Sequence, residues 1–202
     1  MKNKIIKYLD EIIPNPRCEL NYTCDYELLI ATMLSAQTTD KRVNEVTKIL
    51  FTKYPDLKAL KSANKDDIID IVRTLGNYHK KALNVIKIAK DLDEQSNGIV
   101  PNNRDFIESL PGVGRKTANV LLANIYNENC IAVDTHIERV SKRLGLANQN
   151  DDVRLIEEKL TKYFNEYNLN RLHHQLLLFG RYYCKASKPL CDNCKLKDIC
   201  KK

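Results

Sequence analysis

Apolar residues recur at helical spacing along almost the whole chain, and this periodicity restricts the fold more than any other feature of the sequence. In the first segment the apolar side chains share one helical face until a proline ends the pattern, in the order Ile5, Ile6, Leu9, Ile12, Ile13 and Pro14. Only residues 130–133 read as a strand, and this run is too short and too isolated to form a sheet. The sequence therefore predicts an all-α protein.

Further helices are predicted between prolines, glycines and residues that cap helix ends. Asp40 and Asn64 carry side chains suited to capping a helix start, and Gly76 and Gly145 stand where helices commonly end. The predicted helical ranges after the first are 26–37, 40–50, 64–75, 80–92, 104–110, 115–126, 135–144, 152–164 and 169–183.

The size and charge of the chain narrow the class of protein. Its 202 residues are 43% hydrophobic, enough for a buried core without disulfides, and its net charge of +7 favours a polyanionic partner. Residues 1–13 lack the continuous apolar core of a signal peptide, and no apolar run approaches the ~20 residues of a membrane span. We therefore expect a cytoplasmic protein whose seven cysteines are thiols or metal ligands.

Residues 104–126 read as two helices joined by a tight hairpin. Pro111 and Gly112 end the first helix, because proline cannot continue it and glycine permits positive φ. Gly114 leaves the turn without a side chain just before the second helix begins near Arg115. The unpaired N–H groups at the start of that helix then face a bare surface. Such a surface is typical of a phosphate-binding site.

Four cysteines cluster near the C-terminus with the spacing C-x6-C-x2-C-x5-C, at Cys184, Cys191, Cys194 and Cys200. Four thiolates this close together indicate a metal site, and their chemistry suits either structural zinc or an iron–sulfur cluster. The remaining cysteines, Cys18, Cys24 and Cys130, lack such neighbours and are predicted to be buried thiols.

Three motifs in order resemble the endonuclease III branch of the helix-hairpin-helix DNA glycosylase superfamily. They are Leu-Ser-Ala-Gln-Thr-Thr-Asp at residues 34–40, Leu-Pro-Gly-Val-Gly-x-Lys-Thr-Ala at 110–118 with Val-Asp-Thr-His at 133–136, and the four-cysteine cluster. The resemblance implies a two-domain fold. Residues 21–130 would form a six-helix barrel containing the helix-hairpin-helix, and residues 1–20 with 131–202 an iron–sulfur cluster domain whose loop spans 184–200.

The same resemblance assigns Lys116 as the nucleophile and Asp134 as the catalytic carboxylate, at the mouth of a cleft between the domains. A lysine in water is almost fully protonated at neutral pH, so a free amine requires burial, a second cation or a proton acceptor such as Asp134. Each residue has a simpler interpretation. Lys116 would be a solvated lysine at a helix start, and Asp134 a helix cap, unless Thr135 and Glu138 form a capping box there.

Other roles follow from the resemblance as well. Gln37 would enter the space vacated by a flipped base, and Asn77 stands where close relatives commonly carry a leucine wedge. Gly112, Gly114 and Arg115 of the hairpin would contact DNA phosphates. Lys185 and Lys188, between the first two cluster cysteines, form a short basic loop, which is either a solvated face or, held rigid by the metal, a clamp for DNA phosphates. The four cysteines would hold a [4Fe-4S] cluster. His136, His173 and His174 are predicted to pack between helices rather than line the cleft.

The implied activity is that of a bifunctional DNA glycosylase and abasic-site (AP) lyase of base excision repair. It would remove oxidised pyrimidines from duplex DNA and cut the abasic strand by β-elimination through a lysine Schiff base. The expected partner is double-stranded DNA with a damaged base or abasic site. We expect the protein to act as a monomer, associated with the nucleoid and not with a membrane. Two alternatives stay open: a glycosylase of the same fold for another base, such as mismatched thymine, and a non-catalytic helix-hairpin-helix DNA-binding protein.

Overall fold

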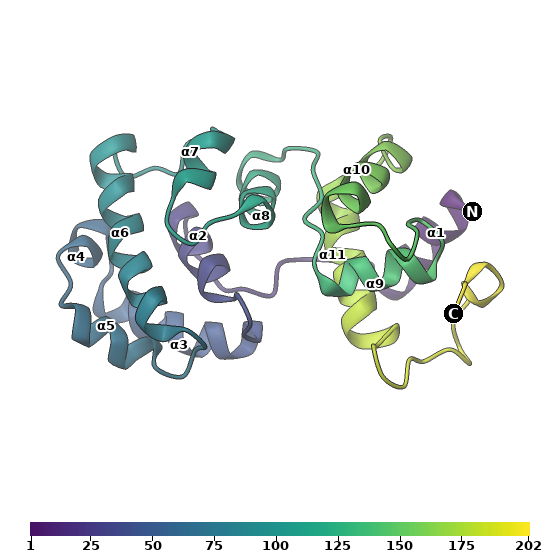
Figure 1. Ribbon diagram of the computed structural model, residues 1–202, viewed down its shortest axis with the longest axis horizontal. Coiled ribbons are helices and arrows are strands. Elements are labelled where there is room, and N and C mark those ends of the chain that lie inside the picture. The colour runs from purple at the N-terminus through teal and green to yellow at the C-terminus, as the bar shows by residue number, and fades with distance from the viewer. The chain divides into compact units, whose positions relative to one another are not determined.

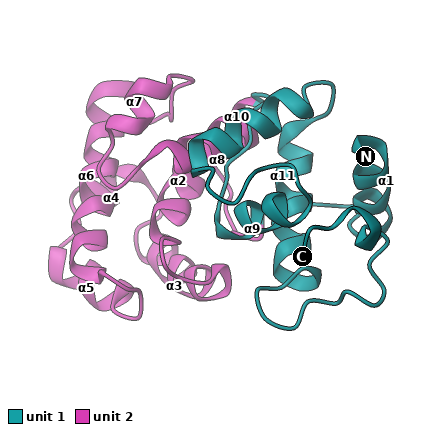
Figure 2. Ribbon diagram, turned by 45° about the vertical axis from the view of Figure 1, so that its right-hand side comes forward, with its two compact units in different colours: residues 1–18, 127–202 teal, residues 19–126 magenta.

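All 202 residues are described in the computed structural model, and every regular element is a helix (Figure 1). The prediction of an all-α fold is confirmed. The chain divides into two compact units, one of residues 19–126 and the other of residues 1–18 with 127–202 (Figure 2). The observed boundaries follow Cys18 and Tyr126, a few residues before those predicted.

The unit of residues 19–126 is built around helix α2. Its helices are α2 (Asp25–Leu34), α3 (Asp40–Lys53), α4 (Leu57–Lys61), α5 (Lys65–Val72), α6 (Tyr78–Ser96), α7 (Arg104–Ser109) and α8 (Arg115–Tyr126). Every residue of α2 from Glu27 to Leu34 is buried, as expected for a helix that is apolar on all sides. It contacts α3, α6 and α8 and lies between the last two in Figure 1.

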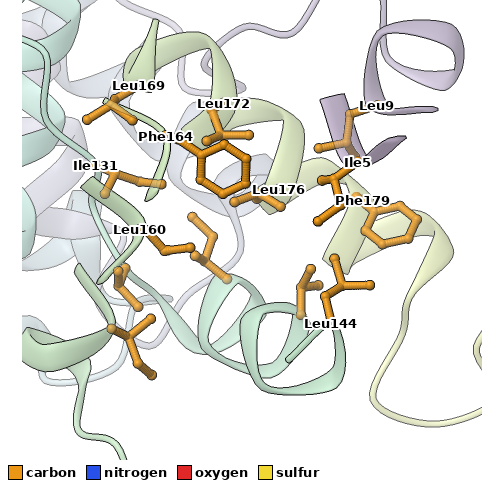
Figure 3. Close-up of a cluster of buried hydrophobic side chains, with 14 of the residues drawn as sticks. Ile5, Leu9, Ile131, Leu144, Leu160, Phe164, Leu169, Leu172, Leu176 and Phe179 are labelled. Atoms are coloured by element: carbon orange, nitrogen blue, oxygen red, sulfur yellow. The ribbon is translucent and has the colours of Figure 1, made fainter. Parts of the chain in front are cut away.

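The second unit joins the two ends of the chain in one core. Its helices are α1 (Lys2–Ile12), α9 (Thr135–Arg143), α10 (Val153–Tyr163) and α11 (Leu169–Leu178), followed by a π-helical turn at Phe179–Tyr183 and a 3₁₀ turn at Lys197–Ile199. Ile5 and Leu9 of α1 are fully buried in the cluster drawn in Figure 3. Tyr8 meets Phe179 edge to face, with ring centroids 6.1 Å apart. Burial of such side chains stabilises a fold by about 1.5–3 kcal/mol each.

Short polar side chains begin most of the helices, as the sequence indicates. Asn64, Asn103 and Asp152 each accept a hydrogen bond from a backbone N–H of the first turn. The prediction that Asp40 caps α3 is wrong, because the Thr39 hydroxyl accepts the bond from Arg42 N and Asp40 is the first helical residue. Thr39 has the extended backbone that a cap requires, with φ −75° and ψ 145°.

Two helices end earlier than their apolar patterns suggest. Helix α2 ends at Leu34, which leaves Gln37 outside it, and α5 ends at Val72, four residues before Gly76. Residues 131–133 are buried but form no strand. The sequence does not predict the short α4. None of the helices is long and apolar enough to span a bilayer.

Candidate functional site

The hairpin between α7 and α8 uses its two glycines differently. Leu110 is extended, with φ −67° and ψ 143°, as the following proline requires. Gly112 has φ +79°, and a Cβ there would overlap the Asn84 amide and lie 3.3 Å from Met33 Cγ. Gly114 is exposed, and a Cβ there would meet nothing within 4 Å. Gly112 is therefore required by packing, whereas Gly114 leaves open space in front of α8.

Lys116 is the second residue of α8, and its side chain is exposed. The first bond within this helix runs from Ala118 N to Gly114 O, at 3.0 Å, so the N–H groups ahead of Ala118 point out of the helix end. The Lys116 amine is therefore accessible, beside the bare surface at Gly114. A negative group is stabilised at such a helix start.

Asp134 is held rigidly at the start of α9. Its Oδ1 accepts hydrogen bonds from His136 N at 2.9 Å and Ile137 N at 2.8 Å. The alternative capping box does not form, because Glu138 pairs with Lys142 at 2.6 Å. Both bonds go to the same oxygen, so Oδ2 remains available for chemistry. The buried residues 131–133 fix the chain that leads into this cap.

Gln37 and Asn77 share an unusual backbone conformation. Each has φ +57°, in the left-handed region that few residues other than glycine adopt, and each side chain is exposed. Gln37 lies in a turn after α2 that is closed by a bond from Thr38 N to Ser35 O, at 3.0 Å. Asn77 immediately precedes α6. Asparagine tolerates this conformation better than leucine does, which gives a physical reason for its presence.

Lys81, on α6, is a residue that sequence reasoning missed. It is 5% exposed, and its ammonium donates to Ala36 O at 2.8 Å and to Thr38 Oγ1 at 3.4 Å. A lysine in an amphipathic helix usually reads as solvated, so no local signal marks this contact. It connects α6 to the turn that carries Gln37.

The four cluster cysteines line one cavity of about 300 Å³. Its wall includes Tyr8, Phe179 and Tyr183, so a largely apolar shell surrounds the thiols. Cysteine thiols gathered around one cavity are donors suited to structural zinc or to an iron–sulfur cluster.

The loop between Cys184 and Cys191 is fastened by two arginines of α9. Arg143 donates to Lys185 O at 2.8 Å, to Ala186 O and Cys184 O at 3.2 Å each, and to Cys184 Sγ at 3.3 Å. Arg139 donates to Gly180 O at 2.7 Å and to Cys184 O at 3.2 Å. Lys185 and Lys188 are exposed on the loop. Helix α9 thus carries Asp134 at its start and the supports of the cysteine loop along its length.

The histidines and the other three cysteines are packed against neighbouring parts of the protein. His173 and His174 are each 4% exposed within α11. His136 packs against Gly180, where an added Cβ would lie 2.9 Å from the His136 Cβ. Cys18, Cys24 and Cys130 are partly buried thiols that form no disulfide, and burial raises the pKa of Cys24.

Known proteins resemble this chain over nearly its whole length. Residues 30–166 match the family described as HhH-GPD superfamily base excision DNA repair protein. Endonuclease III of Haemophilus influenzae is 46% identical over 198 residues, which are 98% of this chain and 93% of that protein. Endonuclease III of Bacillus subtilis is 41% identical over 193 residues, 96% of this chain and 88% of that protein.

Solved structures agree with the sequence relatives. A trapped covalent intermediate of endonuclease III with DNA has a TM-score of 0.93 at 43% identity, covering 100% of this chain and 96% of that one. A thermostable thymine-DNA glycosylase, with a TM-score of 0.86 at 21% identity over 98% of this chain and 93% of that one, shares the fold. The resemblance predicted from the hairpin and the cysteines is confirmed. The chain belongs to the endonuclease III family within the HhH-GPD superfamily of base excision DNA repair proteins.

Proposed function

We propose that this protein is a bifunctional DNA glycosylase and AP lyase that removes oxidised pyrimidines from duplex DNA. The observation that carries the proposal is the accessible Lys116 amine at the start of α8, beside the open space at Gly114. A similar solved structure is of endonuclease III trapped covalently on DNA. A lysine nucleophile accounts for a covalent step of this kind.

The reaction begins when the Lys116 amine attacks C1′ of the damaged nucleotide. The bond from C1′ to the base breaks, the base leaves with its electron pair, and the sugar ring opens to a Schiff base on Lys116. Loss of the C2′ proton then expels the 3′ phosphate, so the strand is cut without hydrolysis. Asp134, held in place by its two backbone donors, stabilises positive charge that develops on the sugar and accepts the lysine proton.

DNA is bound through its phosphates at two places in the chain. The N–H groups and Arg115 at the start of α8 receive one phosphate, and Gly112 and Gly114 keep the hairpin compact and bare in front of it. Lys185 and Lys188 on the cysteine loop bind others and position the duplex without reading its sequence. Gln37 occupies the space that a flipped nucleotide leaves, and Asn77 stands at the second position, where relatives carry a wedge between the strands. The protein acts as a monomer in the cytoplasm, at the nucleoid.

We propose that Cys184, Cys191, Cys194 and Cys200 hold a [4Fe-4S] cluster. All four line one cavity of about 300 Å³, together with the largely apolar side chains Tyr8, Phe179 and Tyr183. Thiolates are the donors that such clusters require. Bound there, the cluster would tie the two ends of the cysteine loop together, while Arg143 holds the carbonyls of Lys185 and Ala186 between them.

Borohydride trapping on a duplex with one abasic site tests the chemistry. Wild type should form a covalent adduct, Lys116→Ala should form none, and Lys90→Ala, which removes an exposed lysine of α6, should match wild type. Asp134→Asn should slow adduct formation while keeping the fold. If folded wild type that contains the cluster gives no adduct, Lys116 is not the nucleophile, and a monofunctional or binding role replaces the proposal.

A further inference from the structure

One face of helix α6 begins at one residue with a proposed DNA role and contacts two further segments to which such a role is assigned above. The positions on this face are Asn77 just before the helix, Lys81 one turn later and Asn84 at the next turn. This spacing of four and three residues places them in a row along the helix. Asn77 itself stands at the wedge position, Lys81 reaches the turn of Gln37, and Asn84 packs against Gly112 of the hairpin.

Lys81 is placed where a lysine is costly to keep. It is 5% exposed, no carboxylate pairs with it, and burial lowers the pKa of its ammonium. A buried charge without a counter-ion opposes folding unless strong hydrogen bonds compensate for the lost water. The Ala36 carbonyl, at 2.8 Å, is the principal acceptor. An apolar side chain would fill this position at less cost, which points to a role other than stability.

The bond from Lys81 acts directly on the backbone of Gln37. The Ala36 carbonyl belongs to the peptide unit that joins Ala36 to Gln37, so the position of that oxygen sets the direction in which the Gln37 side chain leaves the chain. Gln37 is exposed in the left-handed region, which its side chain does not favour by itself. Thr38, whose hydroxyl is 3.4 Å from the same ammonium, follows it in the turn. The strained conformation is therefore supported from α6.

The same lysine is coupled to the second exposed residue through its own backbone. Lys81 N donates to Asn77 O at 3.0 Å in the first turn of α6. Lys81 thus bonds Ala36 O through its side chain and Asn77 O through its backbone N–H. Because an α-helix is stiff, the two exposed amides are kept at a fixed separation.

We propose that Lys81 is a positioning residue that holds Gln37, in register with Asn77, ready to occupy the space left by a flipped nucleotide. This inference rests on the proposed function, because it takes the role of Gln37 from there. In this role Lys81 does not touch the DNA. It orients the Gln37 side chain, which enters the DNA where base stacking is interrupted.

The test compares binding of two duplexes that differ only in one tetrahydrofuran abasic analogue. We expect Lys81→Met to weaken binding of the abasic-analogue duplex about tenfold, since a hydrogen bond from a charged group is lost, and to change binding of the intact duplex by less than about twofold. Lys81→Arg should restore most of the loss. Lys87→Met, an equal charge change at an exposed position of the same helix, should leave both affinities unchanged.

A double-mutant cycle with Gln37→Ala separates positioning from general structure. In the Gln37→Ala background, Lys81→Met should cause no further loss, because the side chain that it positions is absent. The fluorescence of 2-aminopurine opposite the abasic analogue should rise on binding of wild type and rise less with Lys81→Met. If Lys81→Met does not fold, Lys81→Gln, which removes the charge and shortens the reach, takes its place with the same expected results.

Three results would overturn the inference: additive effects of the two substitutions, equal weakening on both duplexes, or no effect of a folded Lys81 variant. The first two assign Lys81 to the fold or to general DNA binding, and the third shows that the Lys81 side chain does not affect binding. Failure of the proposed function looks different, because wild type would then give no borohydride adduct. With a normal wild-type adduct, a negative result concerns Lys81 alone.

Discussion

Replacement of Gly112 by alanine should destabilise the protein, whereas the same change at Gly114 should not. At Gly112 an alanine must adopt φ +79°, which costs about 1–2 kcal/mol, and its Cβ overlaps the Asn84 amide and crowds Met33, which adds about 1–3 kcal/mol. Alanine lowers the conformational entropy of the unfolded chain relative to glycine, which stabilises the folded protein by about 0.4–1 kcal/mol. The expected net loss is about 1–5 kcal/mol.

Gly114→Ala is the matched control in the same hairpin. Its φ is not positive and a Cβ there meets nothing within 4 Å, so only the gain of about 0.4–1 kcal/mol from the unfolded chain applies. Its methyl group does project into the space assigned to a phosphate. We expect binding of abasic-analogue DNA to weaken about tenfold, which is ~1.4 kcal/mol.

Urea unfolding followed by circular dichroism measures the first effect, and fluorescence anisotropy with labelled DNA measures the second. The two variants should separate: Gly112→Ala loses stability, and Gly114→Ala loses affinity at unchanged stability. The reasoning is refuted if Gly112→Ala unfolds at the same urea concentration as wild type. It is also refuted if Gly114→Ala binds abasic-analogue DNA as tightly as wild type does.

Three further changes test other parts of the structure. Asp134→Asn should retain the cap of α9 and slow the lyase reaction. Asp134→Ala should slow the reaction and also remove the cap, at a cost of about 1 kcal/mol of stability; thermal unfolding and trapping rates measure these effects. Arg143→Leu removes every bond from that side chain to residues 184–186, so iron–sulfur absorbance should decay faster at unchanged helical content; equal decay rates would contradict the support assigned to Arg143. The Arg171 hydrogen bond, with help from Gln175, holds the pKa of Asp10 below its usual value. The stability that Asp10 contributes is therefore present above the unfolded pKa of about 3.9 and lost as the pH falls through the lower folded pKa. Wild type should be more stable than Asp10→Asn at the higher pH, and the difference should disappear at the lower pH. Urea titrations at several pH values measure it.

Local signals predicted the hairpin well. Helix α8 spans Arg115–Tyr126 as predicted, because Pro111 and Gly112 interrupt the apolar period and Gly114 precedes its resumption. The capping role of Asp134 could also be predicted, because an aspartate just before a stretch with helical apolar spacing is a common N-cap. At Thr39 and Asp40 two cap-competent residues are adjacent, and the stronger capping preference of aspartate led to the wrong one of the two.

Long-range contacts explain what the sequence did not predict. The apolar pattern of α2 continues past Leu34, but the chain leaves the helix in a turn that is bonded to Lys81, 45 residues away from Ala36. Nothing near Lys81 in the sequence distinguishes it from the exposed Lys80. The cysteine spacing predicted a metal site, and the sequence gives no sign that Arg143 supports the loop between the ligands.

The pairing of α1 with α11 fixes an order of events during synthesis on the ribosome. Asp10 bonds Arg171, 161 residues later, so at about 5–20 residues per second α1 waits roughly ten to thirty seconds for its partner. Throughout that time the apolar face with Ile5 and Leu9 is uncovered, while residues 19–126 emerge complete and can fold. The hairpin and Lys116 are thus finished before the unit that carries Asp134 can close. The nascent N-terminus is consequently the segment that a chaperone would protect.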